Sequence, residues 1–261
     1  MRYFDSHAHY YDERFGSEYP GSVDELIGAL LADKVSYIIN VGTSAETSAL
    51  AVEQASRHPN MYTAIGVHPS DTRFIDDLDL ELAEIERLIT APASKCVCLG
   101  EIGLDYHYPD TDKEKQMRFF RAQMELAQRL AVPICIHDRD AHGDVMEVIR
   151  DYPGVRGVLH SFSGSVEMAR ELVELGYMIS FSGTLTFTNA RRPREVAAAI
   201  PRDRILIETD CPYLAPHPYR GTLNHSGMLE YTNRTLAGIL GITEEESALL
   251  TEDNARRFFG I

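Results

Sequence analysis

The chain has 261 residues, 44% of them hydrophobic, and its 40 acidic against 25 basic residues give a formal net charge of −15 at pH 7. A chain of this length can bury a large core, and no Pro/Gly/Ser-rich linker or internal repeat divides it, so we expect one domain over residues 1–261. The acidic balance argues against a protein that grips duplex DNA through a broad basic surface.

The sequence has neither a targeting nor a membrane-spanning pattern. It begins with a strand-like segment instead of the basic stretch and apolar run of a signal peptide. No apolar run reaches the roughly 18 residues that a membrane span needs. The four cysteines need not pair in a chain that builds its own core, and we interpret Cys96 and Cys98 as core residues. We therefore predict a cytoplasmic protein without membrane contact or an obligate protein partner.

Strand-like and helix-like segments alternate along the chain. Strand-like runs occur at 2–8, 35–41, 61–67, 96–102, 132–137, 156–160, 177–182 and 204–209. Apolar residues at helical spacing predict helices over 22–33, 45–58, 77–90, 113–130, 140–151 and 165–175. Eight strands alternating with helices indicate parallel βα units, and eight is the number that closes a (β/α)₈ barrel of about 250 residues. A doubly wound open sheet is the alternative fold.

Side chains that can bind metal stand at or just beyond the C-terminal ends of these strands. They are His7, His9, Glu101, His137, His160 and Asp210. In a barrel, catalytic groups come from the ends of several strands, whereas an open sheet gathers them at one switch point. The spread therefore favours a closed (β/α)₈ TIM barrel of the metal-dependent hydrolase type.

The first cluster lies in the opening strand, where residues at i and i+2 share a face. Asp5, His7 and His9 are thus expected to point the same way. Two imidazoles on one face can bind a divalent ion, and the carboxylate of Asp5 can orient them. A His-x-His pair alone would be ambiguous.

The whole ligand set suggests two ions. Histidines and carboxylates suit Zn²⁺ or Mn²⁺, with Mg²⁺ an option if carboxylates and waters dominate. Four histidines and two carboxylates exceed what one tetrahedral ion needs, so we expect two divalent ions roughly 3.5–4 Å apart. Glu101 can bridge them, since each carboxylate oxygen can hold one metal.

Seven stretches of the chain, in this order, are similar to motifs of the TatD family of metal-dependent deoxyribonucleases within the amidohydrolase-like barrels. They are Phe4–His9, Gly66–Pro69, Gly100–Tyr106, Ile136–His137, His160–Gly164, Glu208–Pro216 and Asn254–Gly260. The resemblance covers nearly the whole chain. It implies a barrel with a binuclear metal site that hydrolyses phosphodiester bonds in DNA, in some members from the 3′ end.

Carried to the matching positions, the resemblance implies a role for each ligand. His7 and His9 with Asp210 would hold one metal, His137 and His160 the other, and Glu101 would bridge. His68 looks more like a substrate-side residue than a ligand. The expected partner is DNA or another phosphodiester substrate.

The chemistry of the residues supports this assignment. A water shared by two cations supplies hydroxide near neutral pH, and Asp210 could take its proton and return it to the leaving oxygen. Glu208, two residues deeper on the same strand face, is a candidate to fix a neighbouring ligand. Arg139 and Arg220 are the candidate phosphate contacts.

Two features argue against assigning the family's DNA substrate to this chain without further evidence. Where the family commonly has Arg-Gly-(Lys/Arg)-x-Asn-Glu-Pro after the last strand, this chain has RGTLNHSG at 220–227. The net charge argues against a processive grip on duplex DNA. A local basic rim with Arg191, Arg192 and Arg194 could admit a single-stranded end, although such a run is more often a solvated helix start.

Two alternatives remain open. The same hydroxide could attack a carbonyl carbon, as in an amidohydrolase-type ester or amide hydrolase such as a lactonase or an aminoacyl-tRNA deacylase. Lactonase-type barrels often use a carboxylated lysine to bridge the metals, but the nearest lysine, Lys95, precedes its strand. A binding protein that kept the barrel without the chemistry would predict a broken ligand set, whereas the set here is complete.

Overall fold

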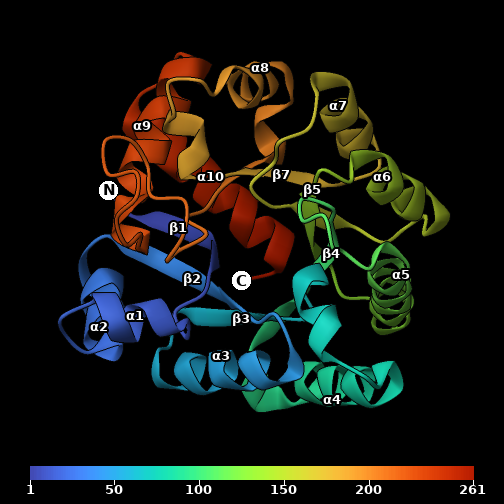
Figure 1. Cartoon of the computed structure of the whole chain (residues 1–261). Coiled ribbons are helices and arrows are strands. Elements are labelled where there is room, and N and C mark those ends of the chain that lie inside the picture. The colour runs from blue at the N-terminus through green and yellow to red at the C-terminus, as the bar shows by residue number, and fades with distance from the viewer.

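A computed structural model describes all 261 residues and shows one sheet of eight parallel strands, each paired with its neighbours in sequence order (Figure 1). The strands are β1 (Tyr3–Ala8), β2 (Val35–Val41), β3 (Met61–Ile65), β4 (Cys96–Asp105), β5 (Ile134–Arg139), β6 (Gly157–Leu159), β7 (Met178–Phe181) and β8 (Ile205–Ile207). Each overlaps a predicted run. The (β/α)₈ barrel is confirmed.

Hydrogen bonds between the first and last strand regions close the sheet. The Asp210 amide donates to the His7 carbonyl at 2.9 Å, and the His9 amide donates to the Cys211 carbonyl at 2.8 Å. Ala8 and Cys211 form a parallel bridge. These bonds rule out the open doubly wound sheet, and they also place His7, His9 and Asp210 next to one another.

Helices surround the barrel. Those at predicted positions are α2 (Val23–Asp33), α3 (Ala45–Arg57), α4 (Leu78–Thr90), α5 (Lys113–Leu130), α6 (His142–Asp151) and α7 (Val166–Glu174). Four further helices lie outside the predicted ranges: α1 (Glu13–Glu18), α8 (Arg191–Ala199), α9 (Leu229–Leu240) and α10 (Glu244–Phe259). Short 3₁₀ turns include η1 (Pro69–Phe74) and η3 (Gly183–Thr186). No helix is both long enough and apolar enough to cross a membrane.

The arginine run at 191–194 begins α8, as the alternative interpretation held. Arg191 pairs with Glu195 one turn later, with 2.7 Å between Nε and Oε1. Arg194 instead donates to backbone carbonyls of the preceding loop, among them that of Leu185 at 3.2 Å. The first arginine thus lies on a solvated face, and Arg194 holds the loop that follows β7.

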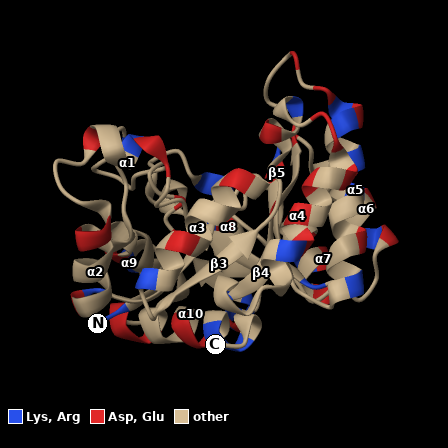
Figure 2. Ribbon diagram, turned by 90° about the horizontal axis from the view of Figure 1, so that it is seen from below, with Lys and Arg blue, Asp and Glu red and all other residues tan.

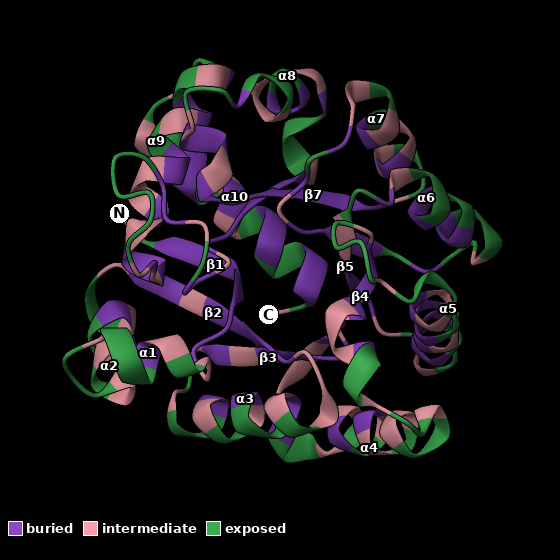
Figure 3. Cartoon of the chain, in the orientation of Figure 1, coloured by how far each residue is buried: buried purple, intermediate pink, exposed green.

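Three clusters of buried hydrophobic residues make up the core, and the smallest, of 10 residues, includes Phe15, Ile27 and Ile38. A cluster of 38 buried residues fills the space between strands and helices. A second cluster of 12 lies in the barrel interior and includes Phe258 and Phe259 of α10, the helix seen within the ring of strands in Figures 1 and 3. Cys98 belongs to this interior cluster, and all four cysteines are free thiols. The interpretation of Cys98 as a core residue is confirmed.

Strand β4 continues three residues beyond its predicted end. Gly103 makes this possible, because its φ of +134° favours glycine and a Cβ there would lie 2.1 Å from the His137 carbonyl oxygen. Close packing of β4 on β5 follows from this glycine. As a result Glu101 and Asp105 both reach the C-terminal mouth of the barrel beside His137.

Candidate metal centre

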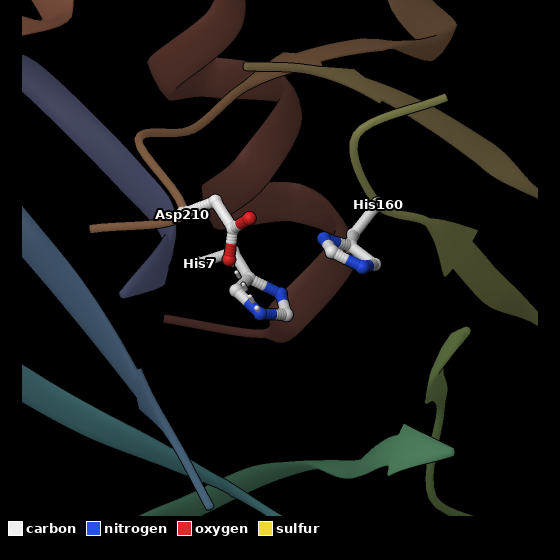
Figure 4. A group of neighbouring side chains, drawn as sticks. All are labelled: His7, His160 and Asp210. Atoms are coloured by element: carbon white, nitrogen blue, oxygen red, sulfur yellow. Dashed lines mark ion pairs between the residues drawn. The ribbon is translucent and has the colours of Figure 1, made fainter. Parts of the chain in front are cut away.

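All six predicted ligands converge at the C-terminal mouth of the barrel. Three groups of three residues could each hold an ion, because the ligand atoms within a group lie within 4.8 Å of one another, and neighbouring groups share a residue. The first group is His7, His160 and Asp210 (Figure 4). The imidazoles of His7 and His160 stack with ring centroids 4.1 Å apart. Residues up to 203 positions apart in sequence are thereby brought together, because the strands or strand ends that carry them, at β1, β4, β5, β6 and β8, meet at one mouth of the barrel.

Glu101 stands at the centre of the cluster. Its Oε1 lies 2.8 Å from His137 Nδ1 and 2.7 Å from His160 Nε2. Its Oε2 lies 3.3 Å from His7 Nε2 and 3.7 Å from His9 Nε2. Each carboxylate oxygen therefore faces its own pair of imidazoles.

Asp210 completes the group on the His7 side. Its Oδ1 lies 3.4 Å from His9 Nε2 and 3.8 Å from His7 Nε2. Its backbone has a φ of 57°, in the left-handed region, three residues after the end of β8. Ser161, which follows the ligand His160, also has a positive φ of 40°. Strained backbone of this kind persists where the surrounding structure holds it and clusters at functional sites.

Carboxylates fix two of the histidine rings from behind. The outer nitrogen of His137, Nε2, donates to Asp105 Oδ2 at 3.2 Å. That of His160, Nδ1, donates to Glu208 Oε1 at 3.2 Å, and the same oxygen accepts the Ser161 amide at 2.7 Å. A buried carboxylate behind a histidine fixes its tautomer and increases its basicity as a ligand. Glu208 thus holds the position expected for it, and Asp105 plays the same part for His137 without having been predicted.

The other two rings are fixed differently. His9 Nδ1 donates to the carbonyl oxygen of Val41, at the end of β2, at 2.7 Å. His7 Nδ1 lies 3.4 Å from the thiol sulfur of Cys135, inside the barrel. A backbone carbonyl leaves no signal in the sequence, and a cysteine inside an apolar run looks like core.

Asp5 does not orient the imidazoles, contrary to expectation. Its carboxylate accepts the Thr209 amide at 3.0 Å, the Thr209 hydroxyl at 2.6 Å and the His7 amide at 3.3 Å. Burial raises its pKa to about 6, against the opposing hydrogen bonds. The pairing register of β1 shifts between Asp5 and Ala8, so strict alternation fails there. Asp5 instead ties β1 to the segment after β8.

The donor set fits divalent cations. With each outer nitrogen acting as a donor, the inner ring nitrogens present lone pairs to one another, 3.0 Å apart between His7 and His9 and 3.1 Å between His137 and His160. Such contacts repel unless a cation lies between them. Imidazole nitrogens with carboxylate oxygens are ligands that Zn²⁺ and Mn²⁺ accept, and Mg²⁺ accepts the carboxylates.

Electrostatics also favour cations here. Burial works against ionisation of Glu101, but His160, His68 and His7 hold the pKa of this carboxyl well below its usual range. Burial lowers the pKa of His7, while Glu101 and Glu208 raise that of His160 despite its burial. An ionised carboxylate thus sits at the centre of a ring of histidines, away from solvent.

His68 faces the same cluster from the loop after β3. Its Nδ1 accepts the Ser70 amide at 3.1 Å, so a neutral ring carries its proton on Nε2, which lies 3.6 Å from Glu101 Oε1. Burial lowers the pKa of His68 to about 3. With Glu101 and His137 it forms another group whose ligand atoms lie close together. His68 is therefore a neutral donor beside the ligands.

The two arginines occupy different positions. Arg139, the last residue of β5, is exposed and lines the mouth, 5.8 Å from the ring centroid of Tyr108. The guanidinium of Arg220 lies over the ring of Phe187 at 4.5 Å, beside the mouth. Lys95 points elsewhere, because its Nζ donates to the carbonyls of Ala55 and His58. It offers no bridge of the carboxylated-lysine kind.

Two hollows open from the cluster. The larger, about 700 Å³, has three tyrosines in its lining, Tyr11, Tyr108 and Tyr213, and we call it the tyrosine arm. The smaller, about 480 Å³, has hydroxyl side chains and two phenylalanines in its lining, and we call it the serine arm; these residues are Ser161, Ser163, Thr184, Phe162 and Phe187. Both arms are lined by the same five residues where they meet: His137, Arg139, His160, Asp210 and Leu214.

Comparison with known proteins gave concordant matches. The family model described as "TatD related DNase" matches residues 4–260. The uncharacterized metal-dependent hydrolase YabD of Bacillus subtilis is 40% identical over 99% of this chain and 99% of its own length. The uncharacterized metal-dependent hydrolase TatD of Mycobacterium tuberculosis is 35% identical over 98% of this chain and 97% of its own length. The crystal structure of YjjV, a TatD homologue from Escherichia coli, superimposes with a TM-score of 0.88 at 29% identity, over 100% of this chain and 98% of that one.

Proposed function

The chain belongs to the TatD family of metal-dependent hydrolases, and from that premise we propose that it hydrolyses phosphodiester bonds in DNA with two divalent cations. Glu101 carries the proposal, since its two oxygens face separate pairs of histidines. A carboxylate in this position can hold one cation on each oxygen, as in two-metal sites that cleave phosphate esters. In the reaction we propose, nucleotides leave one by one from a single-stranded end, starting at the 3′ end as the family resemblance implies.

The ligands divide between the two cations. His7, His9 and Asp210 would hold one, His137 and His160 the other, and Glu101 would touch both. When bound, Mg²⁺, Mn²⁺ or Zn²⁺ would lower the pKa of a water molecule and balance the charge that develops on the phosphoryl oxygens.

Asp210 is our candidate for the proton transfers. Burial works against its ionisation, but His9, His160 and His7 lower its pKa, so the carboxylate is charged at neutral pH. Its side chain is 15% exposed, against 3% for Glu101, so it meets the mouth where a substrate would lie. It would accept a proton from the attacking water and pass it to the leaving oxygen.

Two further groups would hold the phosphate. The neutral His68 ring can donate its Nε2 hydrogen to a phosphoryl oxygen without repelling the cations. Arg139, at the junction of the arms, can donate charge-assisted hydrogen bonds to the same group. Arg220 would contact the strand farther out, beside Phe187.

The shape of the mouth favours single strands. Tyr108 and Tyr213 in the tyrosine arm are exposed and Phe187 in the serine arm is half-buried, so unpaired bases can stack on these rings regardless of sequence. The net charge of −15 provides no extended basic surface for a duplex. A single strand can be threaded through a hollow, whereas a duplex would have to lie across the rim.

The first test is activity of metal-free protein reconstituted in turn with Mg²⁺, Mn²⁺ and Zn²⁺. Substrates are 3′- and 5′-labelled single-stranded DNA, a small phosphodiester and an aminoacyl ester. We expect stepwise shortening of DNA from the 3′ end, dependent on metal. Cleavage of the ester while DNA stays intact would reject the nuclease and point to an amidohydrolase-type deacylase.

Two variants test the site itself. Glu101→Ala and Asp210→Asn should each abolish DNA hydrolysis with little loss of fold, because both residues lie at the mouth and not in the packed layers. Circular dichroism and thermal unfolding check the fold. Retained activity in both variants would exclude the proposed binuclear mechanism.

A further inference from the structure

The two arms differ in charge. Beyond the six ligands, four acidic side chains line the tyrosine arm: Asp12, Glu13, Asp71 and Asp105, the last of which accepts a hydrogen bond from His137. Arg139, which the two arms share, is the only arginine in its lining, and there is no lysine. Both oxygens of Asp12 are already engaged, with the Arg14 amide at 2.9 Å and the Tyr213 hydroxyl at 2.6 Å. Glu13 and Asp71 thus supply the acceptors of this arm.

The serine arm carries much less negative charge. Apart from Asp210, which both arms share, its one acidic lining residue is Asp138, and that carboxylate pairs with His142 Nδ1 at 2.7 Å. At its wall, Phe187 carries the guanidinium of Arg220 on its ring. Apart from the residues that both arms share, the remaining polar lining consists of hydroxyl and amide groups: Ser161, Ser163, Thr184 and Asn189.

This difference gives a bound strand a direction. A polynucleotide carries one charge per phosphate, and acidic side chains close to a phosphate repel it, whereas hydroxyls and arginines attract it. On this ground a bound strand would run outward over the serine arm. The nucleoside beyond the scissile phosphate would then occupy the tyrosine arm, whose volume of about 700 Å³ falls in the range of small-molecule sites.

The walls of the tyrosine arm suit a terminal nucleoside. Tyr108 is 51% and Tyr213 43% exposed, so each ring keeps accessible surface for a base beside the guanidinium near it, that of Arg139 at 5.8 Å and that of Arg14 at 5.4 Å from the ring centroid. Glu13, at the start of α1, and Asp71, in η1, can accept hydrogen bonds from sugar hydroxyls. Figure 2 shows α1 at the end of the barrel away from both chain termini, at the level of the strand ends that carry the ligands.

We propose that the tyrosine arm recognises the free hydroxyl of the terminal nucleoside through Glu13 and Asp71, and that it rejects a terminal phosphate. This inference rests on the proposed nuclease activity and specifies which ends of a strand it accepts. A hydroxyl donates to a carboxylate, but a terminal phosphate brings up to two negative charges against the same carboxylates. Strands that end in a hydroxyl are substrates, and phosphorylated ends are poor ones.

The experiment compares end groups on otherwise identical oligonucleotides. Single strands carrying a hydroxyl or a phosphate at the 3′ end, and a second pair differing at the 5′ end, are digested by the metal-loaded enzyme. At the end where digestion starts, we expect kcat/KM to be about tenfold higher for the hydroxyl than for the phosphate. The ratio should fall as salt is added, because the repulsion is screened.

A double variant tests the two acidic residues. Glu13→Gln with Asp71→Asn should reduce the ratio to within about twofold, because the charges that repel the phosphate are gone. The matched control is Asp76→Asn with Asp79→Asn, which removes two acids that line neither arm and should keep the ratio. Hydrolysis of a small phosphodiester without a nucleoside end shows that each variant is folded and loaded.

The outcomes separate this inference from the function on which it rests. Recognition of the end group would be overturned if the unaltered enzyme digested hydroxyl- and phosphate-ended strands at equal rates. It would also be overturned if the hydroxyl-to-phosphate ratio of kcat/KM stayed the same in the double variant. Either result would leave the nuclease proposal intact. Cleavage of the small phosphodiester with no digestion of any oligonucleotide would overturn the nuclease and this inference together.

Discussion

Each of the four histidines among the predicted ligands turns one ring nitrogen toward Glu101. Its other ring nitrogen contacts a hydrogen-bonding group behind the ring. The six ligands could be predicted because strand ends are visible as the ends of apolar runs. The partners could not all be predicted, for physical reasons that differ. Val41 contributes a backbone carbonyl, which any residue has, and Cys135 sits in an apolar run. Asp105 was open to prediction, since it lies four residues after Glu101 on the same strand face.

The carboxylates behind the histidine rings should affect the affinity of the site for metal. We expect Asp105→Asn and Glu208→Gln each to weaken metal binding about 10-fold to 100-fold, because His137 and His160 lose the acceptors that fix their rings. Isothermal titration of metal-free protein measures the effect. Asp110→Asn, an exposed change in the loop after β4, is the control. An affinity unchanged in both partner variants would show that the ligands are fixed by packing alone.

Arg139 should act on substrate binding. Replacing it by alanine is expected to raise KM for single-stranded DNA about tenfold with kcat little changed, because one charge-assisted hydrogen bond to phosphate is lost. Steady-state kinetics separate the two constants, with Arg170→Ala on the outer face of α7 as the reference variant. Unchanged KM and kcat would dismiss Arg139 as a phosphate contact.

Among the elements, strands were predicted better than helices. Apolar runs mark strands that are buried on both faces, as all eight are here, and each was found within a few residues. Helices α1 and α8 were missed along with α9 and α10, and the last two follow the final strand, where strand–helix alternation gives no further cue. In α10, Leu249 is 58% exposed while Phe258 and Phe259 are buried under the barrel. These two rings pack against interior residues of the barrel, and that interior exists only once the barrel has closed.

The packing of α10 into the barrel should contribute to the free energy of unfolding. We expect Phe258→Ala to lower the free energy of unfolding by about 3 kcal/mol, because it leaves a cavity among the interior residues of the barrel. Leu249→Ala on the same helix should change it by no more than about 0.5 kcal/mol. Urea unfolding of both proteins provides the measurement. Similar losses in the two would mean that α10 does not seal the barrel.

At the scale of the whole molecule, charge is distributed unevenly around the mouth. The net charge could be read from composition, but its partition between two arms depends on which loops the barrel brings together. The acids of α1 and η1 line one arm, and the residues after β6 and β7 line the other. Sequence order gives no indication of this, since the chain passes the mouth eight times.

Few basic residues near the mouth imply a weak dependence on salt. With Arg139 and Arg220 as the phosphate contacts, we expect kcat/KM on single-stranded DNA to fall with a log–log slope of about −1.4, at about −0.7 per phosphate. Initial rates across a series of KCl concentrations give the slope. A value steeper than about −4 would require a longer basic track than these two arginines provide.

Both chain ends lie at the floor of the barrel, on the far side from the metal ligands (Figure 2). Residue Met1 precedes β1 and is 59% exposed, and the chain ends just after α10, where Ile261 packs against the interior cluster. A tether at the N-terminus would thus attach the molecule to a solid support with its mouth toward solution. Immobilised protein should keep its turnover on short substrates, and two copies joined in tandem would each present an unobstructed opening.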